Sequence, residues 1–106
     1  IVGEGESIVV NPANSSGMRY LLVDIYLVRA NEKDKGFRAE IEKNSQELQA
    51  LTMDELSSRD IQELTQPSVK SLVKARLEKQ YETVLKPFAS GQKRIGKLII
   101  SKWIMQ

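Results

Sequence analysis

The sequence predicts an α+β fold, a small antiparallel or mixed sheet with helices packed on one face. Two segments rich in β-branched and aromatic residues, 18–29 and 95–106, lie near opposite ends of the chain and are typical of strands. Between them, residues 37–85 show helical periodicity, and the length of 106 residues fits one domain. We therefore expect the last strand to lie beside residues 18–29, with three helices as the crossover.

The N-terminal part is expected to be a flexible lead-in, residues 1–7, ahead of a single domain over residues 8–106. Residues 8–10 are a short apolar run, long enough for an edge strand. Residues 11–17 are a dense cluster of turn formers, in which Pro12 favours extended geometry at Asn11. This cluster predicts a turn into the first long strand.

The first long strand, residues 18–29, is apolar on both faces. Alternate residues of a strand point the same way, so one face carries Leu21, Val23, Ile25 and Leu27. The other face carries Tyr20, Leu22, Asp24, Tyr26 and Val28. We expect either that both faces are covered or that the second meets a partner chain. Asp24 is expected to pair with a Lys or Arg of the neighbouring strand.

Three helices are expected between the strands. The first covers residues 37–56, and Ser58 then caps a short helix that ends at Leu64. The third covers about residues 67–85, with Thr65 as its candidate cap and Pro67 in its first turn. Helical spacing in the third helix predicts a core-facing stripe, namely Val69, Leu72, Val73, Leu77, Tyr81 and Val84.

The second long strand, residues 95–106, is also apolar on both faces. Strict alternation places Leu98, Ile100 and Ile104 on one face, and Ile99, Trp103 and Met105 on the other. Three helices can cover one face of such a sheet but hardly two. The uncovered face would be a contiguous apolar patch, which usually marks a binding surface. We expect the domain to self-associate through it.

The residue types argue against catalysis and metal binding. The chain has no His and no Cys, which are the usual ligands of zinc and iron–sulfur clusters and the usual bases or nucleophiles of hydrolases. The remaining candidates for acid–base chemistry, Asp24 and the helical Glu40, Glu42 and Glu47, come with no evident pocket. We expect no enzymatic activity, no metal and no cofactor.

Charge is unevenly distributed along the chain. The first 64 residues carry 12 acidic and 7 basic side chains, whereas residues 65–106 carry 2 acidic and 9 basic ones. One interpretation is a binding module for nucleic acid or anionic surfaces, built from Lys93, Arg94, Lys97, Lys102 and Trp103. Lysines that protect an edge strand from aggregation explain the same residues. We favour this second interpretation and expect no nucleic-acid partner.

Lys70 and Lys74 share one face of the third helix, and Glu78 and Glu82 continue it. Such stripes are common on solvated helices, with pairs such as Lys74–Glu78; the alternative is a charged docking edge. Candidate protein-interface residues therefore come from the second strand face, the last strand and this helix: Tyr20, Tyr26, Trp103, Lys70 and Lys74.

Several segments resemble one protein family in their order and spacing. An Asn-Pro turn at residues 11–12 leads into an Arg-Tyr-Leu strand at residues 19–21. Residues 56–64 contain a leucine, two serines and a basic residue, and end in Glu-Leu, and Pro67 then opens the last helix. The chain closes with Trp-Ile-Met-Gln at residues 103–106. From Val9 onward the chain is similar to the FliL family of flagellar basal-body-associated proteins.

This resemblance implies a fold, a location and a role. FliL proteins have one transmembrane helix and a periplasmic domain that resembles the stomatin/SPFH fold. The chain would be this domain, anchored at the periplasmic face of the inner membrane by an N-terminal helix that precedes it. The resemblance also implies a non-enzymatic scaffold of the flagellar motor. Its partners would be the stator proteins MotA and MotB, and copies of itself in a ring.

Overall fold

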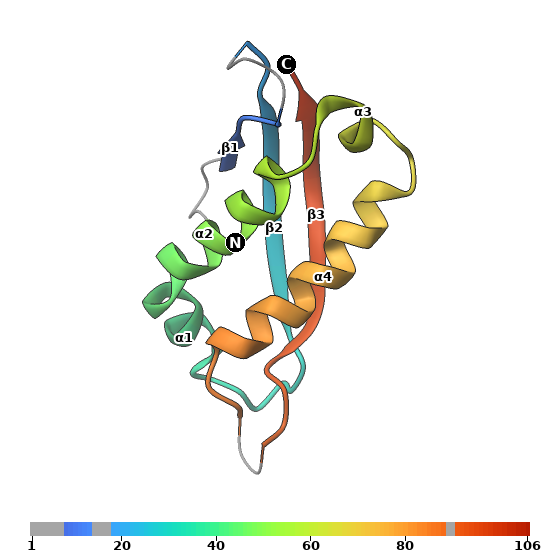
Figure 1. Ribbon diagram of the computed structural model, residues 1–106. Coiled ribbons are helices and arrows are strands. Elements are labelled where there is room, and N and C mark those ends of the chain that lie inside the picture. Colours follow the sequence, from blue (N-terminus) through green and yellow to red (C-terminus); the bar gives the residue numbers. More distant parts are fainter. Residues whose placement is uncertain (1–7, 14–17, 89–90) are drawn as a thin grey trace.

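The structure is a computed structural model that describes residues 8–13, 18–88 and 91–106, and it shows an α+β fold (Figure 1). The lead-in predicted for residues 1–7 and the turn residues 14–17 lie outside the described residues, as do residues 89–90. In chain order the elements are β1 (Ile8–Val10), β2 (Leu21–Arg29), α1 (Phe37–Lys43), α2 (Ser45–Ser57), α3 (Ile61–Leu64), α4 (Val69–Val84) and β3 (Ile95–Met105).

The three strands form one antiparallel sheet in the order β1-β2-β3. β1 pairs with one edge of β2, where Ile8 lies opposite Val23. β3 pairs with the other edge of β2 and is the longest strand (Figure 1). The predicted edge strand at residues 8–10 and the predicted pairing of the two long strands are both confirmed.

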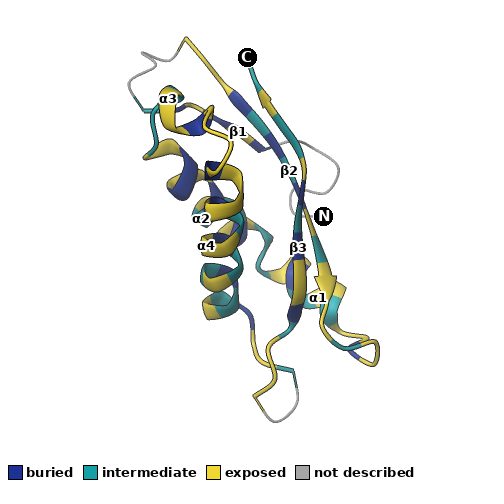
Figure 2. Ribbon diagram, turned by 90° about the vertical axis from the view of Figure 1, so that its right-hand side faces the viewer, coloured by how far each residue is buried: buried dark blue, intermediate teal, exposed yellow. Residues whose placement is uncertain are grey.

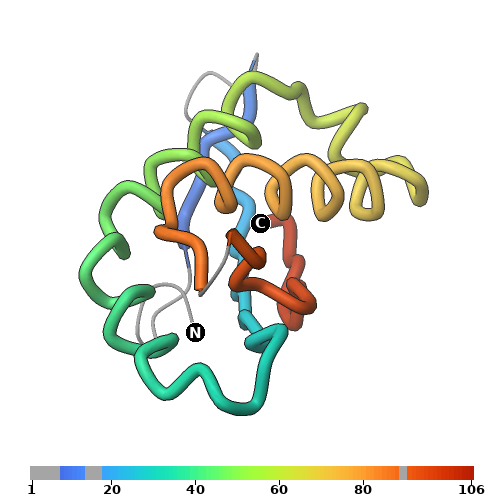
Figure 3. The backbone as a smooth tube through the Cα atoms, turned by 90° about the horizontal axis from the view of Figure 1, so that it is seen from below, coloured from blue at the N-terminus to red at the C-terminus, as the bar shows by residue number. Residues whose placement is uncertain are grey.

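α2 and α4 cover one face of the sheet, as the side view and the view along the strands show (Figures 2 and 3). α2 contacts β1, α4 contacts β3, and the two helices contact each other. The core between the layers consists of buried side chains from the strands and helices, the largest being Tyr81, Leu21, Ile25, Leu48, Leu56, Leu64, Leu77 and Leu98. Among the described residues, no helix covers the opposite face of the sheet.

The single helix predicted over residues 37–56 is wrong, because it is interrupted at Asn44. This residue has φ −107° and ψ 12°, which lie outside the ordinary helical range. Its side-chain amide donates a hydrogen bond of 2.9 Å to the carbonyl oxygen of Glu40. Such local bonds from Asn to the backbone compete with the helix and explain the break between α1 and α2.

The predicted helix caps are also corrected. Asp60, not Ser58, caps α3, because its carboxylate accepts a hydrogen bond of 2.9 Å from the Glu63 amide. α4 follows Ser68, so Thr65 is not its cap. The hydroxyl of Thr65 instead donates to the carbonyl oxygen of Gln62 at 3.0 Å.

α4 buries a narrower stripe than its sequence predicts. Val69, Val73, Leu77 and Tyr81 are buried at intervals of four residues, and Val84 packs against the core from its margin. Leu72 is 50% exposed, so its assignment to the core was wrong. One residue of an α-helix turns by about 100°, which puts Leu72 well to the side of the line that Val73 and Leu77 follow.

β3 departs from strict alternation at two irregularities in its pairing with β2. Between Val28 and Arg29 the partner moves from Lys97 to Ile95, so Gly96 is an extra residue. Between Asp24 and Ile25 the partner moves in the same way from Lys102 to Ile100, so Ser101 is a second extra residue. Each bulge of this kind reverses the faces of the residues beyond it.

The bulge at Ser101 makes the predicted faces of the last strand wrong beyond that point. Trp103 and Met105 turn toward the helices and pack against the core, on the same side as the buried Ile100. Ile104 turns to the uncovered face, where it is 45% exposed. The faces to which the side chains of β3 point are therefore shifted by one residue at each bulge, relative to strict alternation.

Candidate functional site

The structure separates the five predicted interface residues into two groups. Tyr20 and Tyr26 are exposed on the face of the sheet that the helices leave uncovered. Lys70, Lys74 and Trp103 lie on the other side, where α4 faces β3. The predicted residues therefore belong to two different surfaces.

The first surface, the outer sheet face, consists of apolar rows that cross the strands. Val9, Leu22 and Ile104 pair in one row across all three strands. Tyr26 and Ile99 pair in a second row across β2 and β3. Directly opposed residues of an antiparallel sheet share a face. Because the exposed fractions of Val9, Tyr26 and Ile104 lie between 42% and 49%, all three strands present apolar atoms to solvent here.

An ion pair lies between these two apolar rows. The Nζ atom of Lys102 is 3.8 Å from Oδ2 of Asp24 on the adjacent strand, which confirms the predicted pair. The second carboxylate oxygen, Oδ1 of Asp24, is buried and has no hydrogen-bond partner among the described residues. A buried acceptor without a donor is destabilising, so the ion pair leaves part of the Asp24 carboxylate uncompensated.

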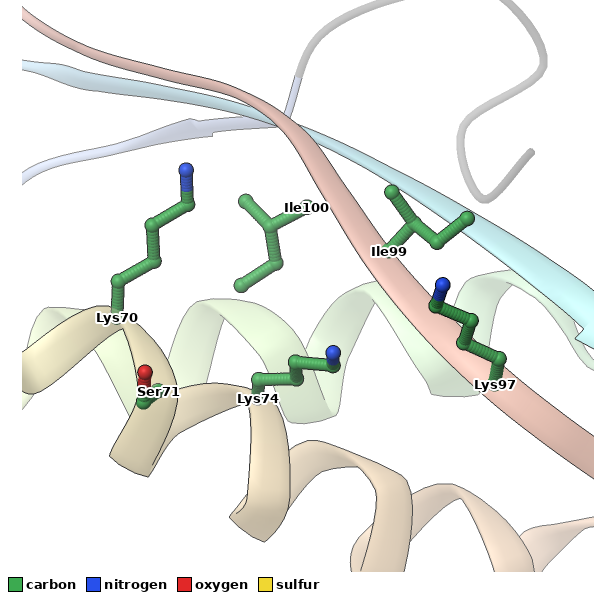
Figure 4. A pocket seen from close by; sticks show the side chains of 6 residues that line it. All are labelled: Lys70, Ser71, Lys74, Lys97, Ile99 and Ile100. Carbon is green, nitrogen blue, oxygen red and sulfur yellow. The ribbon is translucent and has the colours of Figure 1, made fainter.

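The second surface, which we call the lysine groove, consists of two adjoining hollows between α4 and β3. The first hollow has a volume of about 340 Å³ and is lined by Lys70, Ser71, Lys74, Lys97, Ile99 and Ile100. Figure 4 shows the lysines of α4 extending toward the strand that carries the two isoleucines. The second hollow, of about 300 Å³, is lined by Leu64, Thr65, Gln66, Pro67, Lys70, Trp103 and Met105. Lys70 is common to both hollows, and Ile99, on the edge strand β3, belongs to the outer sheet face as well as to the first hollow.

The lysine groove combines basic side chains with an apolar strand surface. None of the described residues that line either hollow is acidic. The indole Nε1 of Trp103 donates a hydrogen bond of 3.3 Å to the carbonyl oxygen of Leu64, which holds the ring in the second hollow. A concave surface lined by charges of one sign attracts ligands of the opposite sign.

Glu78 and Glu82 continue the stripe of Lys70 and Lys74 along α4, but they bind the backbone of β3. Oε1 of Glu78 accepts from the Leu98 amide at 3.3 Å. Oε1 of Glu82 accepts from the Ile95 amide at 2.9 Å. These carboxylates engage the strand in place of the predicted pairs along the helix, and they occupy the outer edge of β3 up to Leu98. The lysine groove begins here, with Lys97 and Ile99 on either side of Leu98 in the sequence.

The basic residues considered for nucleic-acid binding do not share one free surface. Arg94 makes two hydrogen bonds of 2.8 Å to the carboxylate of Asp34. This contact lowers the pKa of Asp34 from its usual value and raises the pKa of Arg94. Lys102 pairs with Asp24, and Trp103 faces the helices. In the described part of the chain these residues form no aromatic stacking platform for bases.

Sequence reasoning missed the place of Lys97 and Ile99 beside Lys70 and Lys74. Lys97 is distant from both helical lysines in the sequence and was grouped with the bases of the last strand. Only the packing of α4 against β3 brings the three lysines to one hollow. No local sequence signal reports such a contact.

The described residues offer neither a metal-binding cluster nor a membrane-spanning helix. In residues 8–13, 18–88 and 91–106, no three acidic side chains gather as a metal site. The helices found there are also too short or too polar to cross a bilayer.

Comparison with known proteins gives one family. The family described as flagellar basal body-associated protein FliL matches residues 2–106, which include both surfaces described above. No curated protein matches the chain.

Proposed function

Since the chain belongs to the FliL family of flagellar basal-body-associated proteins, we propose that it is a non-enzymatic scaffold of the flagellar motor. In this role it binds the stator proteins MotA and MotB and supports their assembly or torque. It acts at the periplasmic face of the inner membrane, anchored by a membrane helix that precedes this chain. Copies of it assemble into a ring around the stator.

The outer sheet face is the observation that carries this proposal. It carries two apolar rows, one of them across all three strands, on either side of the Asp24–Lys102 ion pair, and no described helix covers it. Contiguous exposed apolar surface of this kind is typical of protein-binding sites. Exposed tyrosines such as Tyr20 and Tyr26 are residues that contribute strongly to protein interfaces. A structural role in an assembly requires such a surface and no catalytic residues.

A ring places particular demands on this surface. Copies related by rotation around one axis meet through two different patches, one from each neighbour. The outer sheet face supplies one patch of such a contact. Anchoring in a membrane confines the copies to two dimensions and raises their effective concentration, so a contact that is weak between soluble domains becomes sufficient.

The proposal is tested with the membrane-anchored protein in motile cells. The wild-type protein is expected to cross-link to itself and to the stator proteins. The double variant Tyr26→Asp/Ile104→Asp places two charges on the outer sheet face and should lose these cross-links and reduce swimming. Leu72→Asp is the matched control, because Leu72 is equally exposed but lies on α4.

Two results would contradict the proposal. One is a double variant that keeps its cross-links and its motility while it remains folded. The other is a wild-type protein that cross-links to neither itself nor the stator. Sedimentation of the soluble domain up to millimolar concentration measures the contact between copies separately, and weak self-association is expected there.

A further inference from the structure

We propose that the lysine groove of one copy binds the acidic N-terminal segment, residues 1–7, of a second copy. The inference rests on the proposed function, because it identifies one contact within the assembly. The segment reads Ile-Val-Gly-Glu-Gly-Glu-Ser, with two carboxylates and no basic side chain. It is an apolar and acidic ligand for a groove that is apolar and basic.

Charge complementarity is the first argument. Lys70, Lys74 and Lys97 converge on one hollow, and no described residue that lines it is acidic. Glu4 and Glu6 of the segment supply carboxylates for these ammonium groups. Charges of opposite sign across an interface steer association and select the partner. At the start of β3 the amides of Ile95 and Leu98 have carboxylate partners on α4, so the acidic side chains of this helix are engaged with the strand and not with the three lysines.

Spacing is the second argument. Ile99 lines the first hollow, and Trp103, four residues later, lines the second. A strand rises by about 3.3 Å per residue, so Ile99 and Trp103 are at most about 13 Å apart along β3, and the extra residue Ser101 shortens this span. Val2 and Glu6 are also four residues apart. An extended segment that runs antiparallel to β3 would therefore place Val2 beside Trp103 and Glu6 among the lysines.

Topology favours a second copy as the source of the segment. Residues 1–7 lead into β1 at one edge of the sheet, whereas the lysine groove flanks β3 at the other edge. To enter its own groove, the segment would have to cross the sheet from β1 to β3 and then turn around the outer edge of β3. A head-to-tail contact instead brings different surfaces of two copies together, and seven extended residues span about 23 Å.

The contact depends on side chains more than on strand pairing. Ser101 is an extra residue in β3, and a bulge interrupts the regular row of backbone groups at the strand edge. Substitution of the lysines or of the two glutamates should therefore abolish binding without disturbing the sheet.

The first experiment titrates a synthetic peptide of residues 1–7 into the isotope-labelled 106-residue protein. Trp103 is the only tryptophan, so its indole resonance reports the second hollow and should shift in a saturable manner. Lys70→Glu/Lys74→Glu should weaken binding at least tenfold. Lys79→Glu/Lys93→Glu is the control, because it makes the same change in charge at exposed lysines outside the groove. This control should bind like the wild type.

Charge reversal makes the test specific. A peptide that carries Glu4→Lys/Glu6→Lys should fail to bind the wild-type protein and should bind Lys70→Glu/Lys74→Glu. The proposal is overturned if the indole resonance does not move, or if both lysine variants bind the peptide equally well. This assay contains no stator protein, so its failure leaves the proposed function standing.

The second experiment identifies the copy that supplies the segment. The chain has no cysteine, so a Val2→Cys protein can be mixed with a Gln66→Cys protein under mild oxidation. A disulfide-linked heterodimer should form in preference to homodimers, because Gln66 lines the second hollow. Gln46→Cys, at an exposed position of α2, is the control and should give no such preference. If only the Val2→Cys/Gln66→Cys double variant reacts, within one chain, the segment fills its own groove and the proposal is wrong.

Discussion

Arg94 holds the buried carboxylate of Asp34 through two parallel hydrogen bonds, each of 2.8 Å. Asp34 is 1% exposed and lies in the loop after β2, whereas Arg94 directly precedes β3. The same guanidinium donates to the carbonyl oxygen of Lys86 at 3.4 Å and approaches Glu40 at 4.0 Å. One side chain thus connects the loops at this end of the sheet to α1 and to the end of α4.

Replacement of Asp34 by Ala should lower the free energy of unfolding by about 3 kcal/mol, because it leaves the largely buried Arg94 side chain without its main partner. Urea denaturation measures the change. Arg38→Ala is the control, since the Arg38–Glu42 pair is on the surface and should contribute less than about 1 kcal/mol. Equal losses in the two variants would show that the Asp34–Arg94 pair is no more important than a surface pair.

The contribution of this pair should also depend on pH. The contact with Arg94 lowers the pKa of Asp34 in the folded protein below its ordinary value of 3.8. The unfolded chain therefore takes up the proton first as the pH falls, and the stabilisation declines from about pH 4 downward. The difference in unfolding free energy between the wild type and Asp34→Asn should shrink below pH 4. A difference that stays constant down to pH 2 would contradict this.

Leu77→Ala should cost about 2–5 kcal/mol, because Leu77 is fully buried between α4 and the sheet. Leu72→Ala on the same helix removes the same atoms from an exposed position and should change stability by less than about 0.5 kcal/mol. Thermal or urea unfolding of the two variants gives the comparison. Similar losses would mean that Leu72 is covered in solution, as it would be at an interface.

Gly96→Ala should destabilise the protein by about 1–3 kcal/mol. A Cβ atom on Gly96 would lie 2.9 Å from the Cα atom of Ala30 and 3.1 Å from the carbonyl oxygen of Arg29. Both are backbone atoms and cannot rotate away. Ser101→Ala, at the exposed position of the other bulge, is the control and should be nearly neutral in the same unfolding assay.

Tyr81 should make the protein less stable at alkaline pH. Burial raises the pKa of Tyr81 to about 12, and its hydroxyl is hydrogen-bonded to Thr52. Above pH 10 the unfolded chain loses this phenolic proton before the folded protein does, so stability should fall between pH 10 and pH 12. Tyr81→Phe should remove this part of the pH dependence in unfolding measurements. If Tyr81→Phe loses as much stability between pH 10 and pH 12 as the wild type does, this prediction is wrong.

Local patterns predict the elements of this fold well. Alternation and β-branched residues identify β2 and β3, and spacing of four residues identifies the buried side of α4. The charge of Asp24 within an apolar strand also predicts its partner on the next strand, since opposed side chains of a sheet lie close together. These features depend on neighbours in the sequence or on one strand pair.

The remaining features depend on contacts that no local pattern reports. The break at Asn44 arises because one side-chain amide bonds to the backbone of Glu40. The lysine groove arises because packing brings Lys97 to the helical lysines. Both candidate surfaces were partly predictable, since exposed aromatic and basic residues could be named, but their separation into two surfaces required the three-dimensional arrangement.

The bulge at Ser101 determines which side chains of β3 lie on the outer sheet face and which face the helices. Without this extra residue, the side chains at the end of β3 would point to the opposite faces. The indole of Trp103 and the thioether of Met105 would then face water, and Ile104 would point inward. The apolar row of Val9, Leu22 and Ile104 would then have a gap at one end, and the second hollow would lose its wall. A single exposed serine, which lines neither hollow, is thus a condition for both surfaces.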